Sequence, residues 1–521
     1  MASGPRRRTV PDLMAADTEL TTTLALEERT KLKKSLRRFD LFFFTVCAFV
    51  GLDTLGLVAA NGPQGFTWLI VLAVLFVAPY ALLMAEVGSA FTQEGGPYEW
   101  TKLAFGRLHG AIAAVLYWVT NPLWVGGSLA FIATEAWNDN IFSVGSSGSV
   151  GDYAFKLLFI WFSIGVAIAS LRRGKWIPNL GAFLRLFVMG FFVLTVIVYA
   201  IDHGVHGFPV TDLKPTGAIF LGLAPVLLFN YVGFELGNGA AEEMQDPKRD
   251  VPVAVVRSAD LGVALYAIPI FGIILVLPPE AVTGIGGFLD AVSTTFGVYG
   301  GAKDFLLGVV TIAFVGTLLT SGAVWMIGSD RILAVAAYDG SFPGYFGRFN
   351  ARLGTPVRVN TLSGICASIF MIVAVAAFNG GADSKFAVVL TIAISTTLIS
   401  YLWIFPAALK LRYSHPGVER PYRVPGGMAG IWAATILSTG WVALGSWVAV
   451  FPGTLEPLLG IDYSFNDAWG VSRATFEALA LGTLAAVLLL ALVGYAMGRD
   501  VRAQAATIPL EPLEPTPAAT G

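Results

Sequence analysis

About a dozen apolar stretches, each close to 20 residues long, follow one another between residues 41 and 497 of the chain. A hydrocarbon core about 30 Å thick is crossed by a helix of roughly 20 apolar residues. Lipid offers no partners for backbone polar groups, so segments of this length fold in it as helices. We therefore expect membrane spans at 41–60, 66–90, 109–135, 154–172, 177–201, 216–240, 256–278, 304–329, 357–378, 385–409, 430–452 and 474–497.

Composition indicates the same class of protein. Of the 521 residues, 55% are hydrophobic and 13% are charged, whereas an ordinary soluble domain has about 25% charged residues. The net charge of −2 is close to neutral and gives no indication of a nucleic-acid partner. We predict an all-α polytopic membrane protein of about 12 transmembrane helices, which form a single domain in the lipid bilayer over residues 41–497.

The distribution of basic residues predicts how this bundle is oriented. If residues 1–40 lie in the cytoplasm, then the termini and the even-numbered loops hold 27 of the 33 Lys and Arg residues. Basic residues gather on the cytoplasmic side of membrane proteins. We expect a multi-pass protein of the plasma membrane with both termini cytoplasmic. Residues 1–40 form the N-terminal segment, and residues 498–521, which end in a stretch rich in Pro, Ala and Thr, are expected to be a disordered tail.

Two of the expected spans, the first and the sixth, are interrupted near their middle. Glycine lowers the stability of a helix interior, and a carboxylate at membrane depth is costly. These spans hold corresponding positions in two successive five-span halves, a pattern typical of inverted-repeat transporters with discontinuous helices. The alternative is that the glycines only let neighbouring helices pack closely. The interruptions contain Gly51, Asp53 and Thr54 in the first span, and Phe229, Asn230, Tyr231, Gly233 and Glu235 in the sixth.

Two facing helix breaks can hold a small zwitterion or cation. Exposed N–H groups attract a carboxylate, and freed C=O groups attract an ammonium. We predict that these eight interrupting residues form a substrate site. An ionised Asp53 would repel a bound carboxylate, so an acid at each break suits an amine or a diamine. Alternatively, Asp53 and Glu235 cap the broken helices or pair with Arg185, a basic residue inside the fifth span.

Two schemes of ion coupling stay open, one with protons and one with sodium. Asp53 or Glu235 could carry a proton. Arg185 keeps its charge and could serve only as a fixed counter-charge. Sodium would need hydroxyl and carbonyl oxygens, which the eighth span could supply from Thr317, Thr320 and Ser321.

Several aromatic residues are candidates to line or gate the cavity, although aromatic residues in membrane helices more often pack or anchor at the interface. They are Tyr117, Trp118, Trp124, Phe229, Tyr231, Phe234 and Trp325. The acids Glu86 and Glu94 and the segment 242–247 lie at the expected cytoplasmic ends of spans. We interpret them as gate and loop-capping residues.

No residue pattern indicates catalysis. All four His residues fall at span ends or in loops, and Cys47 and Cys366 lie inside apolar spans, where a thiol behaves as a small hydrophobe. No spacing of Cys or His fits a metal site or a catalytic nucleophile. We expect no enzymatic activity, no metal and no cofactor. A channel or a non-transporting nutrient sensor remains an alternative to a carrier.

Longer motifs follow the spans in order, at 94–100 (EGGPYEW), 231–235 (YVGFE), 242–252 (EEMQDPKRDVP), 339–343 (DGSFP) and 420–427 (RPYRVPGG). Together they resemble the amino acid-polyamine-organocation superfamily, most nearly its glutamate/γ-aminobutyrate antiporter branch. The likeness extends over most of the chain.

The resemblance implies a five-plus-five inverted repeat with two extra C-terminal spans and a substrate held at the breaks. It implies a secondary active transporter of amino acids that works by alternating access, through exchange or proton-coupled uptake; a polyamine or other amine transporter is the alternative. The superfamily usually has a Gly-Ser-Gly type segment at the first break, where this chain has Gly51-Leu52-Asp53-Thr54. That departure weakens the case for binding an α-carboxylate there. No feature indicates an oligomeric state.

Overall fold

The computed structural model describes residues 18–32, 34–173, 176–282, 286–377 and 382–509. Within these residues, ten helices are long and apolar enough to cross a membrane. The two expected spans outside that set are 41–60 and 216–240, because both are broken into shorter pieces. The prediction of an all-α polytopic membrane protein is confirmed.

In the first half of the chain, the second and third spans each continue through a π-helical segment, at Ala73–Val77 and at Val125–Leu129. The helices are α2 (Thr23–Arg29), α3 (Arg38–Phe49), α4 (Leu55–Ala59), α5 (Gly62–Leu72), α6 (Ala78–Ala90), α7 (Pro97–Phe105), α8 (Arg107–Trp124), α9 (Ala130–Asn140), α10 (Val150–Arg173) and α11 (Trp176–His203).

In the second half, a 3-10 helix at Leu236–Glu243 continues the sixth span beyond its break. Shorter 3-10 turns lie at Val210–Leu213, Pro279–Ala281, Phe296–Ala302, Gly344–Phe346 and Pro457–Leu459. The helices are α12 (Gly217–Asn230), α13 (Pro247–Val276), α14 (Gly287–Thr295), α15 (Lys303–Tyr338), α16 (Val357–Ala377), α17 (Ala382–Ser414), α18 (Gly427–Val450), α19 (Phe465–Trp469), α20 (Arg473–Met497) and α21 (Arg499–Arg502).

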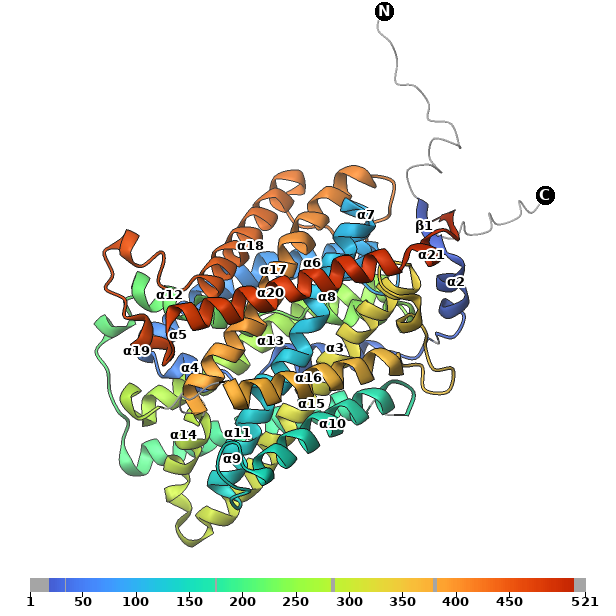
Figure 1. The fold of residues 1–521 in the computed structure, drawn as a ribbon. Coiled ribbons are helices and arrows are strands. Elements are labelled where there is room, and N and C mark those ends of the chain that lie inside the picture. Colours follow the sequence, from blue (N-terminus) through green and yellow to red (C-terminus); the bar gives the residue numbers. More distant parts are fainter. Residues whose placement is uncertain (1–17, 33, 174–175, 283–285, 378–381, 510–521) are drawn as a thin grey trace, which may run out of the picture.

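Helices α2 and α21, which lie near the two ends of the described part of the chain, are at the same end of the bundle (Figure 1). We call this the terminal end; it carries α2, α7 and α21. Helices α4, α12 and α19 lie toward the opposite end, which we call the distal end. The two breaks therefore separate a terminal-side piece of each broken span from a distal-side piece.

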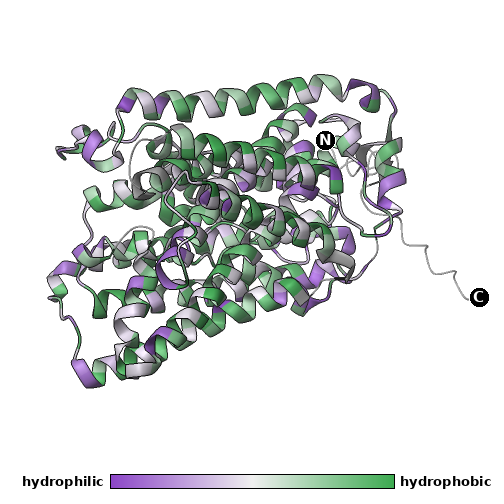
Figure 2. Cartoon of the chain, turned by 60° about the horizontal axis from the view of Figure 1, so that its bottom comes forward, coloured by the Kyte–Doolittle hydropathy of each residue, from purple (hydrophilic) through white to green (hydrophobic). Residues whose placement is uncertain are grey.

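The third span forms the centre of the bundle and the twelfth its edge. The apolar part of α8 and α9 is buried throughout, whereas most of α20 is exposed. Hydrophobic residues run along the long helices, while the strongly hydrophilic ones gather mostly at helix ends and in loops (Figure 2). Exposed apolar side chains such as Leu489 on α20 and Phe162 on α10 suit contact with lipid.

The two terminal segments pair with each other. Strand β1 (Thr18–Thr22) runs antiparallel to β2 (Ala505–Pro509), with Thr22 opposite Ala505. The tail that was expected to be disordered thus begins with a helix and a strand, because β1 provides backbone partners that the composition of the tail does not reveal. Residues 1–17 and 510–521 lie outside the described part of the chain.

Candidate functional site

The two broken spans meet at a small cavity inside the bundle. Span one leaves the helix after Phe49 and resumes at Leu55, and span six leaves it after Asn230. The cavity has a volume of about 10 Å³, which is close to the space that one water molecule needs. Its walls are Ala48, Phe49, Gly51, Asp53, Trp124, Phe229, Asn230, Val232, Tyr266 and Trp325.

The hydroxyl of Tyr266, on α13, bridges the first break. It accepts a hydrogen bond from the Gly51 N–H (2.8 Å) and donates one to the Phe49 carbonyl (3.0 Å). These are backbone groups that the end of α3 leaves without helical partners. The break is therefore fixed in place by a side chain from span seven, and the Gly51 N–H is engaged.

Asp53 brings a carboxylate to the wall of the cavity. Its side chain is buried, and Oδ2 accepts a hydrogen bond from Trp124 Nε1 at 2.9 Å. The Trp124 ring packs edge-on against Phe229 and Trp325, with centroids 5.8 and 6.3 Å away. Three aromatic rings from spans three, six and eight thus surround this acid.

Arg185, on α11, lies fully buried on another side of the first break. Its guanidinium donates to the Val50 carbonyl (2.7 Å), the Thr317 carbonyl (3.1 Å), the Thr320 hydroxyl (3.3 Å) and the Ser321 hydroxyl. It also donates to Gly181 O and Cys47 Sγ. A permanent cation therefore binds a carbonyl oxygen of span one and the oxygens of span eight that were considered for sodium.

At the second break, Asn230 has an unusual environment. Its side chain is 2% exposed and lines the cavity, yet neither its amide nitrogen nor its amide oxygen has a hydrogen-bond partner among the described residues. Buried polar groups are nearly always paired. A ligand with both donor and acceptor groups could satisfy this amide.

Gly233 makes the turn of the second break possible. Its φ of +126° is favourable only for glycine, and a Cβ placed there would lie 3.0 Å from the Trp325 ring. The Gly233 and Phe234 N–H groups both donate to the Tyr80 hydroxyl, at 2.9 and 3.2 Å. The break is thus held by a side chain of α6.

Glu235 is fully buried and faces three tyrosines, not the cavity. Its carboxylate accepts hydrogen bonds from Tyr117 and Tyr401, each at 2.6 Å, and from Tyr80. Because the Tyr80 oxygen already accepts two N–H groups, its own proton points toward Glu235. Three phenol donors suit an ionised carboxylate and join span six to spans two, three and ten.

The structure brings four of the eight predicted substrate residues to the cavity: Gly51, Asp53, Phe229 and Asn230. Thr54, Tyr231, Gly233 and Glu235 are near the breaks but are not among the cavity walls; the Tyr231 hydroxyl donates instead to Leu69 O at 3.0 Å. Sequence reasoning missed Tyr266, because a single tyrosine in an apolar span gives no signal of its role.

Two ion-pair clusters close the terminal end. In the first, Arg331 is fully buried and pairs with Glu94 at 2.8 Å and Glu243 at 3.2 Å. Glu94 also accepts the Glu242 N–H at 3.0 Å. This cluster joins span eight to the loop after span two and to the end of span six; a role of Glu94 as a gate residue stays a prediction.

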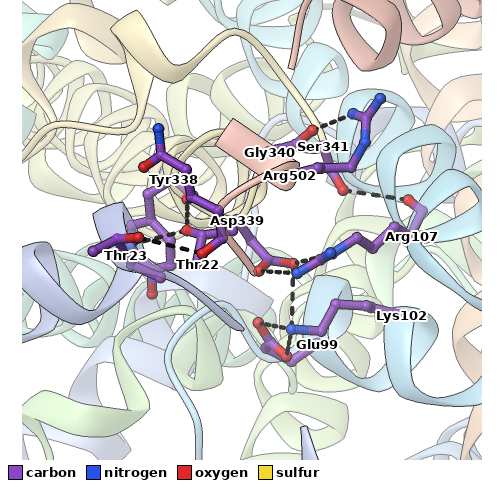
Figure 3. Close-up of polar contacts among 12 residues, drawn as sticks. Thr22, Thr23, Glu99, Lys102, Arg107, Tyr338, Asp339, Gly340, Ser341 and Arg502 are labelled. Atoms are coloured by element: carbon purple, nitrogen blue, oxygen red, sulfur yellow. Dashed lines mark hydrogen bonds and ion pairs between the residues drawn. The ribbon is translucent and has the colours of Figure 1, made fainter. Parts of the chain in front are cut away.

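The second cluster surrounds Asp339, just beyond α15 (Figure 3). Its carboxylate contacts Arg107 at 2.9 Å and Lys102 at 3.4 Å, and accepts the Tyr98 hydroxyl at 2.6 Å. Burial works against ionisation, but Lys102 and Arg107 outweigh it and hold the pKa of Asp339 below its usual value. Arg502 donates to the neighbouring Gly340 carbonyl, which joins the C-terminal segment to this cluster.

Comparison with known proteins identifies the family. The family model described as amino acid permease matches residues 36–461. The chain belongs to the amino acid permease family. A probable agmatine/putrescine antiporter of Lactococcus lactis is 28% identical over 76% of this chain and 83% of its own length. A glutamate/γ-aminobutyrate antiporter of the same organism is 22% identical over 68% of this chain and 72% of its own.

A branched-chain amino acid permease of Bacillus subtilis is 24% identical over 84% of this chain and 95% of its own length. The suspected membership of the amino acid-polyamine-organocation superfamily is confirmed. This permease is a multi-pass membrane protein and a secondary transporter of amino acids or amines, and not an enzyme.

Proposed function

We propose that this permease exchanges small organic cations, namely diamines and related primary amines, through the cavity between its broken spans. The main support is the position of the Asp53 carboxylate, which lines a cavity with ten wall residues. None of these ten residues is basic. A carboxylate in an apolar, aromatic surround favours an ammonium and disfavours an anion. Agmatine and putrescine, named for one relative, are amines of this kind.

The first break supports an amine over an α-carboxylate. Binding a carboxylate at a helix break depends on free backbone N–H groups. The Gly51 N–H donates to Tyr266, and the Gly233 N–H donates to Tyr80. The unpaired amide of Asn230 is then the polar group that could contact the far end of the substrate.

Transport by alternating access requires the cavity to open. A volume of about 10 Å³ is too small for a diamine, so the structure corresponds to a state closed around the site. Opening toward the terminal end would separate the Arg331 and Asp339 clusters. The non-helical residues at each break would provide the hinges.

Exchange without sodium is the coupling that the geometry favours. The Arg185 guanidinium binds the Val50 carbonyl and the Ser321 hydroxyl, so these oxygens are not free to bind a metal ion. Arginine does not release its proton in a protein. If protons are coupled to transport, Asp53 is the residue in the cavity that would carry them.

The charge distribution supports a plasma-membrane location with the terminal end in the cytoplasm. Of the 33 Lys and Arg residues, 27 belong to the termini and the loops expected on that side. The distal end would then face outward.

Counterflow in proteoliposomes tests the proposal. Vesicles loaded with unlabelled putrescine should accumulate labelled putrescine from the external medium. Vesicles loaded with choline and placed in the same external medium should not. The control variant Asp212→Asn removes an exposed acid in a loop and should behave as the wild type. Exchange of glutamate or a neutral amino acid in place of putrescine would overturn the amine assignment, and leakage without a loaded partner would indicate a channel.

A further inference from the structure

A second cavity lies at the distal end, next to the broken spans. Its volume is about 220 Å³. Pro225 and Val226 of α12 are among its walls, and Val226 precedes Asn230 by four residues, which is about one helical turn or ~6 Å. Leu57 of α4 is another of its walls. The distal pocket, as we call it, is thus one turn outward from the central cavity.

The segment between α18 and α20 covers this pocket and contributes Glu456. The Glu456 side chain lines the pocket and is only 4% exposed. Its backbone carbonyl accepts the Ile461 N–H at 2.9 Å, which fixes the turn. Within the described residues, no hydrogen bond or ion pair reaches its carboxylate. A buried carboxylate without a hydrogen-bond donor is unfavourable, and a cationic ligand would stabilise it.

Arg473, the first residue of α20, follows this segment and is engaged by other groups. Arg473 donates to the Pro452 carbonyl at 3.1 Å and the Gly453 carbonyl at 3.3 Å, and it contacts Glu477 at 3.5 Å. Its guanidinium also lies 4.7 Å from the centroid of the Phe465 ring. Arg473 is therefore held by these groups, and among the described residues no ion pair gives Glu456 a counter-charge.

The other polar and aromatic groups of the pocket are suited to bind a ligand that donates hydrogen bonds. The amide nitrogen of Asn61 donates a hydrogen bond to the Leu57 carbonyl (3.0 Å), and its amide oxygen can accept a hydrogen bond from a ligand. Trp469 donates its Nε1 to the Tyr463 hydroxyl at 2.6 Å, and both rings are pocket walls. A carboxylate, an amide oxygen and two aromatic rings match an ammonium, which has three donors and no acceptor.

We propose that the distal pocket is a second binding site, specific for a primary ammonium, with Glu456 as its counter-charge. An amine would bind there before it passes between α4 and α12 to the central cavity. This inference rests on the proposed function in one respect, namely that the cargo is an amine. The site itself is defined by Glu456 and its neighbours and does not require transport.

Equilibrium binding of labelled putrescine to the full chain in nanodiscs tests the site. The variant Asp53→Asn disables the central cavity, so the binding that remains reports on the distal pocket. Adding Glu456→Gln should weaken this binding about tenfold or more, since a hydrogen bond to a charged group is lost. Adding Glu456→Asp, which keeps the charge, should retain most of it.

The matched control is Asp467→Asn in the Asp53→Asn background. Asp467 is an exposed acid on α19, in the same segment but not among the pocket walls. It should leave putrescine binding unchanged. If Asp467→Asn weakens binding as much as Glu456→Gln, the effect is one of general surface charge and the distal pocket is wrong. The pocket is also wrong if Glu456→Gln has no effect.

Two further arms separate the remaining outcomes. Nanodiscs with and without phosphatidylethanolamine distinguish a soluble amine from a lipid headgroup that bears the same ammonium; competition by the lipid would support the site and identify its occupant. Wild-type counterflow reports on the proposed function alone. If putrescine is exchanged but its binding does not depend on Glu456, the distal pocket is refuted and the proposed function stands. If binding depends on Glu456 but no exchange occurs, the proposed function is refuted and the distal pocket stands.

Discussion

The indole Nε1 of Trp124 donates a 2.9 Å hydrogen bond to the Asp53 carboxylate, and both side chains form walls of the central cavity. The indole is a donor only, so it can stabilise an ionised carboxylate but cannot replace a lost negative charge. Trp124 therefore fixes the direction of Asp53 while leaving its negative charge for a cationic substrate.

Asp53→Asn should abolish exchange of putrescine. The variant keeps the size of the side chain but removes the counter-charge, and losing one partner of a buried charge pair weakens binding by at least ~30-fold. Initial rates of counterflow over a range of putrescine concentrations measure this. If a zwitterionic amino acid is also carried, its exchange should survive. Equal loss of both substrates would indicate a role in coupling or folding instead.

Gly233→Leu should block transport without preventing membrane insertion. At a φ of +126° any side chain is strained, and the new Cβ would lie 3.0 Å from Trp325. Counterflow should fall to background while the amount of folded protein in the membrane stays near that of the wild type. Gly190→Leu is the control, since a Cβ there meets nothing within 4 Å. Normal exchange by Gly233→Leu would refute the role of this break.

Glu235→Gln should lower thermal stability. The amide nitrogen of glutamine cannot accept a phenol proton, so at least one of Tyr80, Tyr117 and Tyr401 loses its acceptor. A buried donor left unpaired costs about 1–3 kcal/mol. Thermal melting of the purified protein in detergent can be monitored by size-exclusion chromatography. The melting midpoint of Glu235→Gln should be lower than that of the wild type and that of the control Glu280→Gln, which replaces an exposed acid. An unchanged midpoint would contradict the tyrosine cage.

Replacing sodium by choline should leave the rate of putrescine exchange by the wild type unchanged. The Val50 carbonyl and the Ser321 hydroxyl already bind the Arg185 guanidinium. Arg185→Ala should reduce exchange more than tenfold because it leaves these oxygens unpaired in the closed state. Lys214→Ala, which removes an exposed charge, provides the comparison. Sodium dependence of the wild type would show that this assignment of Arg185 is wrong.

Asp339→Asn should destabilise the terminal end by roughly 3 kcal/mol at neutral pH, since Arg107 and Lys102 each lose a buried acidic partner, although Lys102 keeps its contact with Glu99 at 2.6 Å. The pKa of Asp339 is lower in the folded protein than its ordinary value. Its contribution is therefore complete above about pH 4 and is lost as the pH falls below that value. Melting midpoints of the wild type and the variant should converge in acid, and Asp500→Asn, an exposed acid, should match the wild type throughout.

The spans and their breaks could be predicted from the sequence because each depends on local composition. A run of about 20 apolar residues specifies a membrane helix wherever it occurs. Glycine together with an acid in the middle of such a run indicated the interruptions after Phe49 and Asn230. The assignment of the eight break residues as a substrate site stays a prediction. Four of these residues are walls of the central cavity.

The polar partners of these residues could not be predicted, since they come from distant spans. Tyr80, Tyr117 and Tyr401 lie in three different helices, and no spacing in the chain relates them to Glu235. Arg185 was considered as a partner for the two acids. In the structure it binds carbonyl and hydroxyl oxygens of spans one and eight, and it has no hydrogen bond to Asp53 or Glu235 among the described contacts.

The pairing of β1 with β2 has a consequence for biosynthesis. Thr18–Thr22 leaves the ribosome before the first span, whereas Ala505–Pro509 emerges only after the last. The small sheet, and the Arg502 contact beside it, can therefore form only after every helix of the bundle has been synthesised. Formation of the sheet requires synthesis to have passed residue 505, and a protein truncated before that residue would leave β1 without its partner strand however well its helices had assembled.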